Sequence, residues 1–168
     1  DRSTGCRYLD AFILSSEPTT ALPSYCKRLA EYMRLDEETQ IVGLVLMHRV
    51  AASTTHRHSE GAPCPGRVTH FDITRYNVHR LMLVAFVLAA KSHNDCYYPM
   101  TWYGAVGGVP ARELIQLELV FSSLLEYRFF VEPNEHTKTH RELLTDPCMM
   151  CDHHDAASLS SSPGAPPR

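Results

Sequence analysis

The chain has no excess of basic residues and no long apolar run. Sixteen Lys and Arg against nineteen Asp and Glu give a formal net charge of −3. Such a balance offers no basic field for the phosphate backbone of a nucleic acid or for an acidic membrane surface. The longest uninterrupted apolar run, Leu81 to Ala90, has ten residues, about half of what spans a bilayer. We therefore expect neither a nucleic acid nor a membrane as a partner.

The chain also lacks the signatures of several common catalytic sites. It has no glycine-rich loop with a Lys to cradle a phosphate, and no Ser or Cys nucleophile has a recognisable base. The first residues, Asp-Arg-Ser-Thr, do not form the basic and then apolar leader of a secreted protein. The six cysteines are scattered, and Cys26 lies in a helical pattern, so reduced thiols are expected. These features favour an intracellular protein, in the cytoplasm or the nucleus.

What the chain does have is the composition of one folded domain. Apolar residues make up 44% and charged residues 21% of its 168 residues, well away from the range of disordered chains. We expect an N-terminal extension over 1–21, a helical domain over 22–145 and a tail over 146–168. The tail is rich in Ser, Ala, Pro and Gly without periodicity, so it is expected to be disordered.

The apolar periodicity predicts an all-α fold. In the first helix Tyr25, Leu29, Tyr32 and Met33 recur at helical spacing, and Asp36 is placed to cap a second helix that packs antiparallel to it. The six helices are expected at residues 24–35, 36–50, 74–93, 99–106, 110–125 and 133–144.

The third predicted helix, from a cap at Thr74 to about His93, is apolar on nearly all sides in its middle. A helix of this kind is surrounded by other helices, and each fully buried large side chain contributes roughly 1.5–3 kcal/mol. A long loop over 53–70 precedes it. Gly107 and Gly108 are expected to stop the fourth helix, and Pro110 to begin the fifth.

Five short motifs occur in an order that resembles a cyclin box, and more narrowly the P/U-type cyclins, which include the phosphate-sensing cyclins of fungi. They are Asn77-Val-His-Arg-Leu81, Ala89-Ala-Lys91, Gly107-Gly-Val109, Leu117-Glu-Leu119 and Leu124-Leu-Glu-Tyr-Arg-Phe129. The resemblance implies a single five-helix box with a central third helix and short flanking helices. Too few residues remain for the second repeat of many cyclins.

The resemblance also implies a function without catalysis or cofactor: a cyclin, which forms a heterodimer with a cyclin-dependent serine/threonine kinase and activates it. In this family a Lys at the end of the third helix and a Glu in the fifth bind main-chain groups of the kinase. The matching residues are Lys91 and Glu118. Further kinase-binding candidates on the same match are Leu88, Ser92, Ser122, Tyr127 and Phe129.

The chain departs from the family pattern at several positions. Ser92 and Ser122 stand where cyclins tend to place Phe or Leu, which indicates a less apolar contact. His48, before Arg49, occupies a position where many cyclins have an Asp paired to a buried Arg. The first helix has Tyr25-Cys-Lys-Arg-Leu29 in place of an apolar substrate-docking motif. The kinase, the substrates and the pathway, whether cell cycle or nutrient signalling, remain open.

Some residues of the chain are also typical of other kinds of protein. A zinc site is suggested by Cys148, Cys151, His153 and His154, although the spacing between the ligand pairs is short for structural zinc. A weaker metal candidate is formed by His56, His58 and Cys64. A metal-dependent phosphohydrolase would draw on His70, Asp72, His93, Asp95 and the His154-Asp155 pair. The transcription-factor relatives that share the cyclin fold are a third alternative, but they need a basic face.

Overall fold

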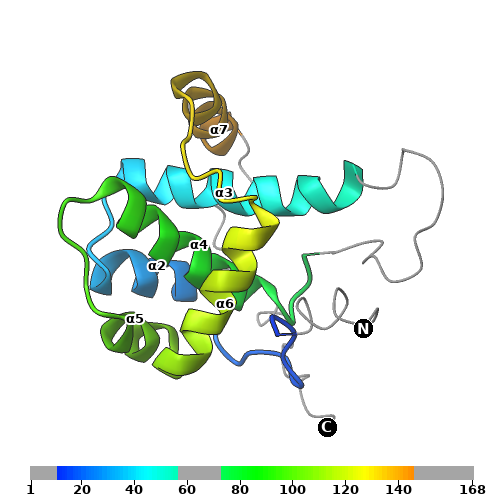
Figure 1. Ribbon diagram of the computed structural model, residues 1–168, viewed down its shortest axis with the longest axis vertical. Helices are drawn as coiled ribbons and strands as arrows, with labels where there is room; N and C mark the ends of the chain where they lie inside the picture. The colour runs from blue at the N-terminus through cyan, green and yellow to red at the C-terminus, as the bar shows by residue number, and fades with distance from the viewer. Residues whose placement is uncertain (1–10, 57–72, 146–168) are drawn as a thin grey trace, which may run out of the picture.

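The computed structural model describes residues 11–56 and 73–145, and these residues form helices and no strands (Figure 1). This finding confirms the all-α expectation. No helix within these ranges combines the length and the apolar character needed to cross a membrane. The six helices are α2 (Leu22–Tyr32), α3 (Glu37–His56), α4 (Val78–His93), α5 (Met100–Gly107), α6 (Ala111–Leu124) and α7 (Pro133–Thr145).

Helix α4 is the centre of the fold, as its composition predicts. Every residue from Leu81 to Ala90 is buried, and α4 packs against α2, α3, α5 and α6. In Figure 1 it lies between α3 on one side and α2 and α5 on the other. An all-round apolar helix is stable only when neighbours cover all of its faces, so this position follows from the sequence.

The expected cap of α3 is present. The backbone N–H of Thr39 donates to Oδ1 of Asp36 at 2.8 Å, which satisfies one of the free amides at the start of the helix. Hydrogen bonds from Thr39 hold the pKa of the Asp36 carboxyl below its usual value. At its other end α3 continues to His56, past the predicted loop start at residue 53.

The expected start of the third helix is wrong by several residues, because α4 begins at Val78 and Asn77 is its N-cap. The Asn77 side chain accepts a hydrogen bond from the N–H of Thr74 at 2.8 Å through Oδ1. The backbone N–H of Asn77 in turn donates to the Thr74 carbonyl at 3.1 Å. Residues 74–77 therefore close a separate turn before the helix.

The prediction that the first two helices pack against each other is also wrong. Helix α3 packs chiefly against α4, while α2 packs against α4 and α5. The short connection between α2 and α3 fixes where the second helix starts, but the apolar faces of both are covered by α4. Tyr32, expected in the core stripe, is exposed at the last residue of α2, whereas Tyr25, Leu29 and Met33 are buried.

Residues before α2 also contribute to the core. Phe12 is fully buried, and its ring centroid lies 6.3 Å from that of Phe121 in α6. A hydrogen bond also holds this N-terminal segment in place: the N–H of Leu14 donates to the Tyr76 carbonyl at 3.0 Å. The first ten residues, residues 57–72 of the loop and the predicted tail from residue 146 lie outside the described ranges.

Helix α7 lies on the outer side of α3, away from α2 and α5 (Figure 1). It buries no residue of its own, and its contacts with α3 are mainly polar. Glu135 pairs with Arg49, and His136 Nε2 lies 2.8 Å from Glu38 Oε2. His140 Nε2 lies 3.1 Å from a carboxylate oxygen of Glu37. The position of α7 therefore depends on these polar pairs together with the partly buried Leu143, which packs against the core.

Candidate functional site

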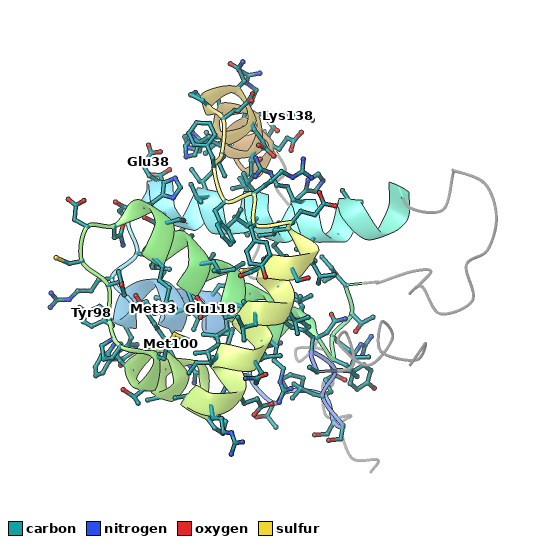
Figure 2. All side chains as sticks on the ribbon, viewed as in Figure 1. Met33, Glu38, Tyr98, Met100, Glu118 and Lys138 are labelled. Atoms are coloured by element: carbon teal, nitrogen blue, oxygen red, sulfur yellow. The ribbon has the colours of Figure 1, made fainter. Side chains whose placement is uncertain are left out.

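Lys91 and Glu118 come together at the surface where α4 ends beside α6. The Lys91 Nζ donates to Oε1 of Glu118 at 2.6 Å and to Oε2 at 2.9 Å. The side chains keep 26% and 17% of their surface exposed. Figure 2 labels Glu118 near the middle of the helical cluster. The sequence resemblance selected both residues, and the fold brings their charged groups into contact.

The geometry of this pair leaves hydrogen-bonding capacity for a partner. An ammonium has three N–H donors and a carboxylate has about four acceptor positions. Both bonds run from one Nζ to the two oxygens of one carboxylate, so they occupy one side of the ammonium and one lone pair on each oxygen. The two charges balance each other, so the pair presents polar groups without a net charge. A partly exposed pair of this kind contributes at most about 1 kcal/mol to folding.

Two candidates on α4 stand beside Lys91. Leu88, one turn earlier, is buried in the core and offers little surface to a partner. The Ser92 side chain is exposed, and its hydroxyl donates to the Leu88 carbonyl at 2.8 Å. A serine side chain has only one CH2 group, and this hydroxyl faces its own helix. Position 92 therefore offers a partner little apolar surface. Ser122, one turn after Glu118 in α6, is buried and likewise offers little.

The remaining candidates, Tyr127 and Phe129, lie in the aromatic turn, which we define as residues 126–130. Glu126 and Tyr127 both have positive φ angles, 54° and 58°. This conformation costs a non-glycine residue about 1–3 kcal/mol. The N–H of Tyr127 donates to the Ser122 carbonyl at 2.9 Å, which ties the turn to α6. The Tyr127 side chain is 66% exposed.

The aromatic turn combines one partly buried ring with two exposed rings. Tyr127 and Phe129 meet edge to face, with ring centroids 6.4 Å apart. Phe129 is partly buried against the core, whereas Phe130 is 77% exposed. Exposed aromatic rings beside partly buried ones are typical of protein interfaces. The sequence interpretation missed Phe130, although its place directly after Phe129 was visible.

Ile115 and Leu119 were also missed as surface residues. They are four residues apart on α6, and both are exposed. The buried face of α6 contains Leu114 and Leu117. Residues one or two positions after these in the helix, such as Ile115 and Leu119, therefore face outward. The helical spacing alone could have identified them. With Glu118 between them, they add apolar surface to this face of α6.

Arg49 is a further residue that the motifs did not identify. It lies in α3, and its Nε donates to Oε1 of Glu135 in α7 at 2.9 Å. Its Nη1 donates to the carbonyls of Arg128 at 3.0 Å and Phe130 at 2.9 Å. The hydrogen bond from Arg49 holds the pKa of the Glu135 carboxyl below its usual value. His48 is exposed, so the ionic contact at this point of α3 is made by Arg49 with α7.

The metal and hydrolase alternatives find no support in the described residues. Among them no group of three or more His, Cys, Asp or Glu side chains is arranged to hold a metal ion. His93 and Asp95 lie in the described part. The other side chains of those alternatives fall outside it: His56, His58, Cys64, His70, Asp72, Cys148, Cys151, His153, His154 and Asp155.

The comparisons with known proteins agree on one family. The family model described as Cyclin matches residues 4–129. Cyclin-U4-1 of Arabidopsis thaliana is 32% identical over 119 residues, which cover 71% of this chain and 52% of that protein. Cyclin-U1-1 of the same plant is 31% identical over 123 residues, with 73% and 52% covered.

A fungal relative shows the same likeness. PHO85 cyclin-7 of Saccharomyces cerevisiae is 28% identical over 128 residues, which cover 76% of this chain and 44% of that protein. The chain spans about half the length of the curated relatives it matches. These matches confirm the P/U-type resemblance that the sequence motifs carry.

Proposed function

The chain belongs to the cyclin family, and from this membership and the geometry of its surface we propose that it is the regulatory subunit of a cyclin-dependent serine/threonine protein kinase. It has no catalytic role of its own and acts by forming a heterodimer. Two relatives carry PHO85 in their names, a budding-yeast and a fission-yeast protein. Their names support a kinase partner for this chain too.

The observation that carries the proposal is the contact between Lys91 and Glu118. The pair joins the end of the central helix to α6 with distances of 2.6 and 2.9 Å, and it leaves a donor and acceptors unused. Such groups can bind unpaired N–H and C=O groups of a partner backbone. Leu119, the exposed apolar residue next to Glu118 in α6, would help to exclude water from this contact once a partner covers it.

Activation follows from a difference in affinity. A kinase whose regulatory helix moves between two positions exists as a mixture of active and inactive forms. The chain shifts this mixture because its face fits the active position better. Lys91 and Glu118 supply the directional polar contacts, and the aromatic turn supplies apolar area. No chemical step is required of the cyclin.

The test is affinity capture of a kinase from the native cell, with a kinase assay of the eluate. We expect the wild-type chain to capture an active kinase. The double variant Lys91→Ala and Glu118→Ala should bind it about 30-fold more weakly or worse, because loss of a desolvated polar pair costs about 2–5 kcal/mol. Loss of a partly exposed pair should change the free energy of unfolding of the free chain by no more than about 1 kcal/mol.

The chain offers a matched control for this experiment. Lys138 and Glu142 form another Lys–Glu pair, 3.8 Å apart on α7, with both side chains largely exposed. Figure 2 shows Lys138 on α7, well separated from Glu118. The variant Lys138→Ala with Glu142→Ala makes the same chemical change and should capture kinase as the wild type does. Undiminished capture by the Lys91 and Glu118 variant would contradict the proposed contact.

A further inference from the structure

Arg49 connects three parts of the molecule through one guanidinium group. Its Nε and Nη2 face the Glu135 carboxylate of α7. Its Nη1 donates to the main-chain carbonyls of Arg128 and Phe130. These bonds use four of the five N–H groups of the side chain. Only about a quarter of the side chain is exposed, so this is a supported structural contact rather than a solvated surface arginine.

We propose that Arg49 is the positioning residue of the kinase-binding surface, because it holds the aromatic turn in the conformation that presents its rings. This inference rests on the proposed function. Arg49 itself is assigned no contact with the kinase. It acts through the backbone on either side of Phe129, and the exposed rings of Tyr127 and Phe130 make the contact.

The distances show how Arg49 fixes this segment. The two carbonyls that it binds, at 3.0 and 2.9 Å, belong to residues two apart in the chain. Both carbonyls point toward the same Nη1 atom. Holding both therefore fixes the direction of the segment, and with it the side on which the Phe129 ring meets the core. With only one of these hydrogen bonds, the backbone of the segment could still rotate about the bonded carbonyl.

The aromatic turn needs such support because its own backbone does not favour the observed conformation. Glu126 and Tyr127 are both in the left-handed region, which side-chain-bearing residues adopt rarely. The N–H groups of Glu126, Tyr127 and Arg128 donate back to carbonyls that precede the turn, those of Ser123, Ser122 and Leu125. The following helix, α7, buries none of its residues. These backbone bonds hold the start of the turn, and Arg49 adds the contact that holds the carbonyls of Arg128 and Phe130 at its end.

The two groups of contacts can be separated by mutation. Glu135→Gln weakens the tie to α7 but leaves the Arg49 guanidinium beside the two carbonyls. Arg49→Met removes both ties while keeping a side chain of similar length. Arg49→Lys keeps the charge and can pair with Glu135, but a compact ammonium does not reproduce the planar array of donors. A purely structural tie to α7 predicts equal effects of Glu135→Gln and Arg49→Met.

The experiment measures kinase affinity and amide hydrogen exchange of the free chain for each variant. We expect Arg49→Met to weaken kinase binding about tenfold, or about 1.4 kcal/mol, and to speed exchange at residues 127–131. Arg49→Lys should fall between Arg49→Met and wild type in both measurements. Glu135→Gln should stay within about threefold of wild-type affinity. If Arg49→Met does not fold, the Arg49→Lys measurements carry the test.

The outcomes distinguish failure of this inference from failure of the proposed function. If the wild type binds no kinase, the proposed function is wrong and the positioning role for binding falls with it. If the wild type binds and the Arg49 variants bind equally well, only the positioning role is wrong. Weaker binding with unchanged exchange at residues 127–131 also overturns it, because Arg49 would then act by another route.

Discussion

Gly43 shows how one residue sets the distance between two helices. A Cβ placed on Gly43 in α3 would lie 2.4 Å from Cδ1 of Phe86 in α4. We expect Gly43→Ala to destabilise the chain by about 1–3 kcal/mol through this overlap, although alanine favours the helix by about 1 kcal/mol. The free energy of unfolding measured in urea checks this.

A second substitution tests whether the Phe86 ring is the cause. Phe86→Leu removes the ring atoms that a Cβ at position 43 would meet, at a cost of its own. The double variant should then be less destabilised than the two single changes added together, which a double-mutant cycle measures. Additive effects, or a stabilising Gly43→Ala, would show that the helices move apart without strain.

At the residue scale, the sequence allows the prediction of side chains that stand in a motif. Lys91 and Glu118 could be named in advance, and they are in contact in the structure. Whether they bind a kinase stays a prediction. The role of Arg49 could not be found, because its acceptors are 79 to 86 residues away. Two of them are main-chain carbonyls, which every residue has and no sequence pattern marks.

At the element scale, periodicity and capping chemistry predict that a helix exists better than they predict its ends and neighbours. Asp36 marks the start of α3 because its side chain binds a local amide. The expectation that Thr74 caps the third helix is wrong because Asn77, which accepts a hydrogen bond from the Thr74 N–H, stands directly before the helix. The packing of α2 on α4 instead of α3 depends on the whole set of apolar faces, which no single helix specifies.

Helix α7 gives a prediction about pH. The Arg49 hydrogen bond lowers the pKa of Glu135 from 4.5, so the ionised form favours the folded state. This contribution is present above pH 4.5 and is lost as the pH falls through the lower pKa of the folded state. We therefore expect wild type to be more stable than Glu135→Gln at pH 7, with the difference shrinking below about pH 4.5.

Urea unfolding of both proteins across this pH range makes the measurement. The other charged or titratable groups that face this part of α7, including His48 and Lys138 and the pairs with Glu37 and Glu38, are the same in both proteins. Subtracting the two curves therefore isolates position 135. A difference that grows as the pH falls would mean that the ionised carboxylate opposes folding.

At the scale of the whole molecule, the fold class and the family could be predicted from the sequence because both depend on features spread along the chain. The ten-residue apolar run predicts a surrounded helix, and α4 is that helix. The ordered motifs predict a cyclin, and the family model covers residues 4–129. The contact of Phe12 with the core was not foreseen, because an isolated aromatic residue has no periodicity.

The same central helix offers a test of binding that involves the whole fold. Amides in the buried middle of α4 exchange with solvent mainly when the molecule unfolds globally. A kinase that binds only the folded chain therefore slows this exchange by the factor 1 + [kinase]/Kd. With free kinase at about 100 times Kd, we expect a slowing of about 100-fold, or about 2.7 kcal/mol.

The double variant Lys91→Ala with Glu118→Ala separates specific binding from general effects of the added protein. At the same kinase concentration its α4 exchange should be slowed only a few-fold, because an affinity about 30-fold weaker leaves the kinase near three times Kd. The exchange of the Lys138→Ala with Glu142→Ala control should be slowed as much as that of wild type. Equal slowing in wild type and in the Lys91 and Glu118 variant would place the kinase contact on another face of the molecule.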